Sequence, residues 1–322
     1  MKVYFDKDCD LGLIRDKRVA VLGYGNQGRP QALNLRDSGV TQLVVAGREG
    51  ERPQSEGFDV MTPAEAAGWA DVVVMLIPDE VQAQVYKDEL EPYLRPGSAL
   101  AFAHGLNIRF GLIEPRPDLD VFLVAPKGPG TALRQLYVQG DGMIALFAIA
   151  QDASGSAEAL ALSYAAALGS GRAGILQTSF AEEAEADLFN EQAVLWGAIP
   201  ELIYAGFETL TEAGFAPEIA YFECVSEVKL IADLIYGRGI AGMREAISNT
   251  AEFAALEGGI RIVNADTRTE MRRILREVRS GQLAKKLMED AAAGYPRLGA
   301  SRAKAAAHPI EAVGERLRQL KT

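Results

Sequence analysis

Short apolar runs alternate with amphipathic stretches through the first half of the chain. Five runs are almost continuously apolar and rich in β-branched residues: 18–23 (RVAVLG), 42–46 (QLVVA), 71–77 (DVVVMLI), 98–103 (SALAFA) and 120–125 (DVFLVA). A half-exposed antiparallel strand would alternate apolar and polar positions, whereas a strand covered by helices on both faces is apolar throughout. The pattern therefore predicts a parallel, doubly wound sheet with crossover helices, one of them at residues 31–37.

The pattern changes near residue 170. A further apolar run at 143–149 can extend the sheet, a helix is expected at 157–168, and a short apolar run follows at 173–178. Beyond that run only helical periodicity remains. We therefore expect a doubly wound α/β domain at residues 1–180 and an all-helical domain at residues 181–322.

Composition narrows the class of protein. A chain of 322 residues with 48% hydrophobic and 24% charged residues is typical of a globular protein of one large or two smaller domains. The net charge of -11 argues against nucleic acid and anionic membranes as partners. Cys9 and Cys224 are isolated, which favours reduced thiols and a cytoplasmic location, and no apolar stretch approaches the ~20 residues that span a bilayer.

A glycine-rich turn follows the first apolar run. It has the pattern G-x-G-x-x-G and comprises Gly23, Tyr24, Gly25, Asn26, Gln27 and Gly28. Between a strand and a helix, such glycines allow a tight turn and close approach of the backbone to a pyrophosphate at the helix N-terminus. The sequence therefore predicts that residues 1–180 form a Rossmann-like dinucleotide-binding domain. A glycine turn that serves backbone geometry alone is the alternative.

The loop after the second run should decide which dinucleotide binds. An acidic residue there bonds the ribose 2′-hydroxyl of NAD, and basic or hydroxyl groups hold the 2′-phosphate of NADP. The loop contains Arg48 and Arg52 but also Glu49 and Glu51. Charge alone therefore leaves both cofactors open.

Two residues with catalytic chemistry follow later apolar runs. His104 comes after SALAFA, and Lys127 comes after DVFLVA. Open α/β sheets bind ligands at the carboxyl ends of their strands, where both residues are expected. A packing role for the histidine and a solvated lysine are the alternatives.

Two pairs of carboxylates stand out in the second half. They have i,i+4 spacing: Asp187 with Glu191, and Glu223 with Glu227. On a helix each pair shares one face, where the like charges repel, and a hard divalent cation such as Mg²⁺ would relieve the repulsion. Ordinary exposed acids are the alternative. Ser179 and Glu182 have the S-x-x-E pattern of a capping box that would begin the first of these helices.

Seven motifs in order along the chain carry a family resemblance. They are GYGNQG, PDEVQ, AFAHG, APKGPG, DLFNEQ, YFECVSEVKLI and SNTAE. Together they resemble the short-form (class I) ketol-acid reductoisomerases, also called acetohydroxyacid isomeroreductases. Members convert 2-acetolactate or 2-aceto-2-hydroxybutyrate into dihydroxy acids for valine, isoleucine and leucine synthesis, by Mg²⁺-dependent alkyl migration followed by reduction with NAD(P)H.

The resemblance implies a role for each candidate residue. Asp187 would bridge two Mg²⁺ ions and Glu191 would support one, while Glu223 and the catalytic Glu227 would come from a partner subunit. The remaining implied contacts are catalytic His104 and Lys127, substrate-binding Ser248, and cofactor-binding Asp79, Glu80, Val81, Gln82 and Gly130. The helical domains would be knotted or intertwined in a homodimer or a higher oligomer.

Departures from the family pattern concern the cofactor. Asn26 replaces a serine of the glycine turn, and Arg29-Pro30-Gln31 replaces His-Ala-His. In the loop after the second strand, Glu51 and Pro53 occupy the positions of two serines that bind the 2′-phosphate. A carboxylate repels that phosphate, so we predict a preference for NADH over NADPH, which Arg48 and Arg52 would oppose.

Two other classes compete with this interpretation. A metal-free dehydrogenase of the 3-hydroxyacid type also joins a Rossmann half to a helical half, but it gives the four carboxylates no role. A non-catalytic dinucleotide sensor is the third class, and nothing in the sequence favours it.

Overall fold

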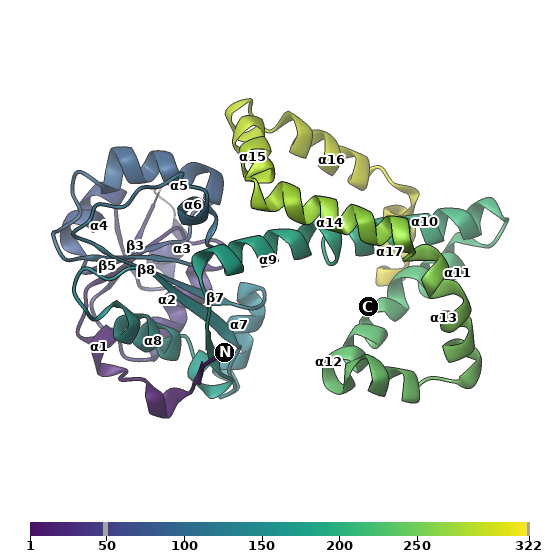
Figure 1. The fold of residues 1–322 in the computed structure, drawn as a ribbon, viewed down its shortest axis with the longest axis horizontal. Helices are drawn as coiled ribbons and strands as arrows, with labels where there is room; N and C mark the ends of the chain where they lie inside the picture. The colour runs from purple at the N-terminus through teal and green to yellow at the C-terminus, as the bar shows by residue number, and fades with distance from the viewer. Residues whose placement is uncertain (48–50, 321–322) are drawn as a thin grey trace. The chain divides into compact units, whose positions relative to one another are not determined.

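The computed structural model describes residues 1–47 and 51–320, apart from the side chains of residues 51 and 52. The chain divides into two compact units, Met1–Ala186 and Asp187–Thr322, coloured purple to teal and teal to yellow in Figure 1. The division falls inside a helix, six residues beyond the domain boundary predicted from the sequence. Each unit is described by itself.

A single mixed sheet forms the centre of the first unit. In the described residues its order is β1-β9-β8-β7-β6-β5-β2-β3-β4. The strands are β1 Val3–Tyr4, β2 Val19–Leu22, β3 Leu43–Ala46, β4 Asp59–Met61, β5 Val72–Met75, β6 Ala99–Phe102, β7 Asp120–Pro126, β8 Ala145–Gln151 and β9 Ile175–Gln177. Strands β2 to β7 pair in parallel, as predicted. Strand β8 runs antiparallel to β7, and β1 antiparallel to β9, which the apolar pattern did not indicate.

Helices cover both faces of this sheet (Figure 1). They are α1 Gly12–Arg15, α2 Gly28–Asp37, α3 Glu51–Ser55, α4 Pro63–Trp69, α5 Asp79–Val85, α6 Leu106–Arg109, α7 Gly130–Val138 and α8 Ala157–Ala167. In β2, Val19 and Val21 face the layer that contains α2 and α8, and Ala20 and Leu22 face the layer that contains α4. Because alternate side chains point to opposite faces, a strand buried on both sides must be apolar at every position.

The second unit is helical throughout its described residues. Its helices are α9 Phe180–Ala193, which begins in the first unit, α10 Ala198–Glu212, α11 Pro217–Tyr221, α12 Glu227–Glu245, α13 Asn249–Ile262, α14 Ala265–Arg279, α15 Gln282–Ala292, α16 Pro296–Ala306 and α17 Pro309–Gln319. A π-helical turn at Phe222–Ser226 joins α11 to α12. A Rossmann-like sheet followed by helices is the predicted fold class, and the prediction is confirmed.

The core of the second unit is small. It consists of Phe207, Ala220, Ile310, Val313 and Leu317, contributed by α10, α11 and α17. Helices α12 and α13 bury none of their residues, although both carry large apolar side chains. The second unit therefore leaves much of its apolar surface uncovered within one chain.

Candidate active site

The glycine turn joins β2 to α2, as the sequence predicted. Gly23 has a φ of +96°, and a Cβ there would lie 2.7 Å from the carbonyl oxygen of Leu76, just beyond β5. A Cβ on Gly28 would lie 2.0 Å from the carbonyl oxygen of Gly23. Both positions therefore require glycine, because a side chain would strike backbone.

A second loop packs against this turn. The side-chain amide of Gln27 donates to the carbonyl oxygen of Gly128, at 3.1 Å. Gly130 is buried at the start of α7, and a Cβ on it would lie 1.8 Å from the carbonyl oxygen of Asn26. The loop after β7 and the glycine turn after β2 therefore form one backbone cradle, of which Gly25 and Asn26 are exposed members.

The cradle lies where open α/β sheets bind dinucleotides. Strand β2 has β3 on one side and β5 on the other, which is the point where the strand order reverses. Helix α2 starts at Gly28, so the positive end of its dipole lies at the turn. The glycines, the helix N-terminus and the switch point together fit a pyrophosphate.

The PDEVQ segment begins α5, on the neighbouring strand end. Gln82 is buried, and its amide donates to the carbonyl oxygen of Ile77 and to Asp79 Oδ1, at 2.9 and 3.0 Å. Asn107 donates to Gln82 Oε1 at 3.0 Å. Glu80 is half-buried and Val81 is exposed. Gln82 therefore fixes the segment, while the first turn of α5 offers the outward-facing groups.

Three potential metal ligands converge near the carboxyl end of β6. His104, Glu183 and Asp187 each offer one ligand atom, and these atoms lie within 4.8 Å of one another. His104 follows β6, while Glu183 and Asp187 lie one turn apart on the same helix, α9. A Cβ on Gly105 would lie 2.6 Å from the carbonyl oxygen of Phe180, so the glycine lets α9 approach β6 closely.

Glu183 is the residue that the sequence analysis missed. It is only 2% exposed, and its Oε2 accepts a hydrogen bond from the backbone N–H of Gly105 at 2.8 Å. Its carboxylate also lies 3.2 Å from Nδ1 of His104 and 3.8 Å from Nζ of Lys127. A buried carboxylate needs such partners. Its spacing of four residues before Asp187 was the available signal, hidden among the other acids of this stretch.

The N-terminus of α9 is only half a capping box. Ser179 Oγ accepts from the backbone N–H of Glu182 at 3.1 Å, as predicted. The Glu182 carboxylate does not return the bond to the backbone of Ser179, because it accepts from Thr178 Oγ1 at 2.7 Å. Glu191 lies one turn beyond Asp187 and is exposed.

The second carboxylate pair does not lie on a regular α-helix. Glu223 belongs to the π-helical turn and Glu227 begins α12, and both are exposed. The wider i→i+5 turn alters the one-face alignment that an α-helix would give, and such turns are frequent at functional sites. Ser248 caps α13, accepting from the backbone N–H of Ala251 at 3.2 Å.

The structure describes part of the predicted specificity loop. Arg48 lies outside the described residues, as do the side chains of Glu51 and Arg52. Pro53 is buried in α3, and Tyr24 is half-buried with its hydroxyl directed at Glu56.

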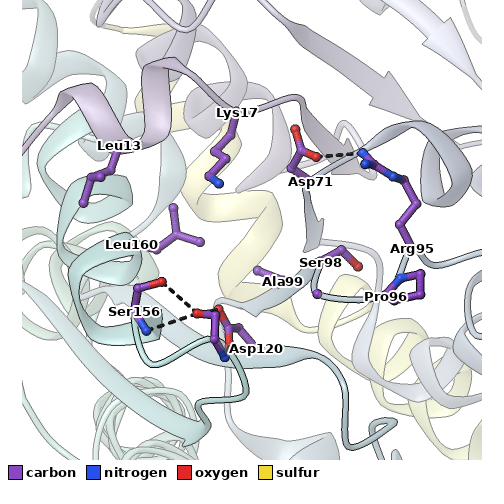
Figure 2. A pocket seen from close by; sticks show the side chains of 12 residues that line it. Leu13, Lys17, Asp71, Arg95, Pro96, Ser98, Ala99, Asp120, Ser156 and Leu160 are labelled. Carbon is purple, nitrogen blue, oxygen red and sulfur yellow. Dashed lines mark hydrogen bonds and ion pairs between the residues drawn. The ribbon is translucent and has the colours of Figure 1, made fainter.

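A cavity of about 240 Å³ lies at the amino ends of the strands (Figure 2). Its lining includes Asp71, Ser98 and Asp120, which stand at the amino ends of β5, β6 and β7. Figure 2 shows Arg95 paired with Asp71 there, at 2.8 Å. The residues of the candidate site follow the carboxyl ends of the strands, so this cavity is separate from it.

The cradle and the polar cluster define a nucleotide-dependent oxidoreductase built on a Rossmann-like sheet. Residues 13–174 match the NADPH-binding domain of acetohydroxy acid isomeroreductase, and residues 180–322 match the C-terminal domain of ketol-acid reductoisomerase. The chain belongs to the ketol-acid reductoisomerase family. The activity that follows is conversion of an acetohydroxy acid into a dihydroxy acid with a nicotinamide cofactor.

Solved structures agree with the family. An NADH-preferring ketol-acid reductoisomerase from an uncultured archean is 43% identical, with 99% of each chain covered and a TM-score of 0.96. A pyrroline-5-carboxylate reductase from Coxiella burnetii is 16% identical, covers 84% of this chain and 98% of its own, and has a TM-score of 0.57. The latter shows a shared fold only. Family membership sets aside the metal-free dehydrogenase and the sensor. Among the described residues, no helix has the length and apolar character needed to cross a bilayer.

Proposed function

We propose that the ketol-acid reductoisomerase reaction takes place where His104, Glu183 and Asp187 converge, with two Mg²⁺ ions bound and NADH as the preferred cofactor. The observation that carries the proposal is the grouping of these three ligand atoms within 4.8 Å at the carboxyl edge of the sheet. This is the edge on which the glycine cradle also lies. Hydride transfer requires the nicotinamide and the substrate to be in contact. A cofactor site and a substrate site at the carboxyl ends of the same sheet meet this requirement.

The donor set supports magnesium. Asp187 and Glu191 are successive carboxylates on α9, and Glu223 and Glu227 are exposed carboxylates in the second unit. Carboxylate oxygens suit Mg²⁺, whereas zinc prefers thiolates and imidazoles. When bound, two such ions supply Lewis-acid polarisation of the ketol oxygens and stabilise the charge that develops there.

Residues of the chain itself orient the reacting groups and transfer protons. Buried Glu183 holds the imidazole of His104 through Nδ1 and so fixes the orientation of the ring. Lys127 lies near the same carboxylate and places a cation beside the cluster. Ser248 would bind the substrate carboxylate from the partner chain. Glu227 would serve as the acid or base of the alkyl migration.

Acidic character near the ribose supports NADH. The family pattern has serines where this chain has Glu51 and Pro53, and a carboxylate repels a 2′-phosphate. The similar archaeal enzyme is NADH-preferring. We expect kcat/KM to favour NADH by about tenfold or more. Steady-state rates with both cofactors test this, and a clear advantage for NADPH would refute it.

The uncovered helices support a homodimer. Tyr236 on α12 is 96% exposed, and Phe253 and Ile260 on α13 are 65% and 70% exposed. An apolar surface spread over two helices with no buried residue needs a covering partner. A second copy of the chain, with the same surface, satisfies this by two-fold symmetry.

Acetolactate turnover with and without Mg²⁺ tests the reaction. Chelation should abolish turnover, and Asp187→Asn should lower kcat by at least about a thousandfold and weaken Mg²⁺ binding in calorimetry. Glu182→Gln, on the first turn of the same helix but bonded to Thr178, is the matched control. Full turnover in EDTA would exclude the proposed chemistry.

Mixing two inactive variants tests whether the site is shared. Asp187→Asn and Glu223→Gln each destroy one half of the ligand set. If the carboxylate pairs come from different subunits, a hybrid dimer retains one intact site, and re-equilibrated mixtures should recover roughly a quarter of wild-type activity. No recovery, with subunit exchange verified by mass spectrometry, would place all four acids in one chain.

A further inference from the structure

An acidic side chain on the described part of the specificity loop is bound to the glycine turn and to helix α2. Glu56, one residue beyond α3, accepts hydrogen bonds from Arg29 at 2.6 Å (Nη2 to Oε1) and 2.9 Å (Nε to Oε2). It also accepts a hydrogen bond from the hydroxyl of Tyr24 at 2.5 Å. Tyr24 is the second residue of the glycine turn, and Arg29 lies in the first turn of α2.

Packing holds this arrangement in place. The ring of Tyr24 meets Phe58 edge to face, with centroids 5.7 Å apart. The guanidinium of Arg36 lies 4.8 Å from the centre of the Phe58 ring and donates to the backbone carbonyl of Glu56 at 2.7 Å. Burial and the hydrogen bond to Glu56 raise the pKa of the Tyr24 phenol, so it remains a neutral donor. Glu56 is therefore fixed through both its side chain and its backbone.

The position of the ion pair relates it to the adenosine half of a dinucleotide. In this fold the ribose 2′ position lies beside the glycine turn and the loop that follows the next strand, which here is β3. Arg29 and Glu56 come from the elements that flank this position. A guanidinium at this position would bind a 2′-phosphate, because its N–H donors match the geometry of phosphate oxygens.

We propose that Glu56 is a specificity-determining residue, which engages Arg29 and so denies the 2′-phosphate of NADPH the guanidinium at the start of helix α2. The inference rests on the proposed NADH preference and gives it a second cause, independent of Glu51. Among the described residues, Glu56 is the acidic partner of Arg29. The two side chains are 32% and 25% exposed, so solvent screens the pair only in part.

The test measures binding of two probes that differ by the phosphate alone. Adenosine 2′,5′-bisphosphate and 5′-AMP are titrated by calorimetry into wild type, Glu56→Gln, Arg29→Gln and the double variant. Glutamine keeps the size of the side chain and an acceptor for Tyr24. Glu56→Gln should bind the bisphosphate about tenfold more tightly, with 5′-AMP unchanged, and kcat/KM for NADPH should rise in parallel.

The double variant decides whether Arg29 is responsible. If Glu56 acts by occupying Arg29, the gain should vanish when both residues are replaced. A gain in bisphosphate affinity that survives in the double variant, or an equal loss of affinity for both probes, would overturn the proposal. Glu56 would then have a structural role only. Glu218→Gln is the matched control, because it breaks a Glu–Arg pair of 2.7 Å in the second unit.

Failure of the proposed NADH preference and failure of the inference about Glu56 are distinguishable. The wild-type NADH/NADPH ratio reports on the proposed preference, and the change in the bisphosphate/AMP ratio on replacing Glu56 reports on this inference. Wild type could favour NADPH while Glu56→Gln still shifts the ratio, or the reverse.

Discussion

The first unit has an extensive apolar core of its own, and the second unit has only a small one. Every residue of β2, β5 and β6 is buried, with apolar side chains packed on both faces of the sheet. In the second unit, α12 and α13 bury none. Apolar helices that face water within one chain are costly, since burial of apolar area drives folding. The proposed homodimer accounts for this contrast, because the nucleotide-binding half has its core within one chain and the helical half would be completed by a second.

The largest expected effect comes from placing a charge on the uncovered helices. Phe253→Glu should dissociate the dimer and reduce activity by at least about a thousandfold, because the second carboxylate pair would be lost. Sedimentation velocity and acetolactate turnover check this.

The control has the same chemistry in the first unit. Val138 is 66% exposed at the end of α7, and Val138→Glu should leave mass and turnover unchanged. A Phe253→Glu protein that stays dimeric and active would remove the contrast between the two units.

A core substitution tests whether the first unit is stable without assembly. Leu100 in β6 is fully buried, and Leu100→Ala should cost about 3 kcal/mol in the free energy of unfolding. The cost should not depend on protein concentration, because the site lies within one unit of one chain. Urea unfolding at two protein concentrations measures it. A cost that changes with dilution would mean that the first unit also depends on assembly.

Dilution should affect the helical unit selectively. For a dimer, each tenfold dilution removes about 1.4 kcal/mol of stability. We expect the part of the far-ultraviolet transition that comes from the second unit to move to lower temperature on dilution, while a probe in the first unit, such as Trp69, moves less. Coincident movement of both transitions would show that the two units unfold together.

The smallest expected effect is a pH dependence in the second unit. A hydrogen bond from Arg316 lowers the pKa of Glu218 below 4.5 in the folded chain. Because the folded pKa is depressed, this pair contributes stability above pH 4.5 that is lost as the pH falls through the folded value. Thermal unfolding from pH 7 to pH 3.5 should show a slightly shallower loss for Glu218→Gln. Identical profiles would show that the pair contributes nothing.

The residue pattern predicted the strands of the nucleotide half well, because strands buried on both faces leave an unmistakable apolar run. It missed β1 and β4, which have two and three residues and too few positions for a pattern. It also could not give the direction of β8, since an apolar run is the same in either direction. Glu183 escaped notice because acids one turn apart look alike until burial distinguishes them.

The local residue order determined the glycine turn, the carboxylate spacing and the helical second half, since each depends on neighbours within one turn of chain. The seven motifs that carry the family resemblance are local in the same sense. Only the tertiary structure decided that Glu183 lies beneath His104 and beside Lys127, and that Glu56 engages Arg29 and Tyr24. These contacts join residues about 27 to 79 positions apart in the sequence. Such residues come into contact only when the chain folds, because folding determines which side chains are buried together.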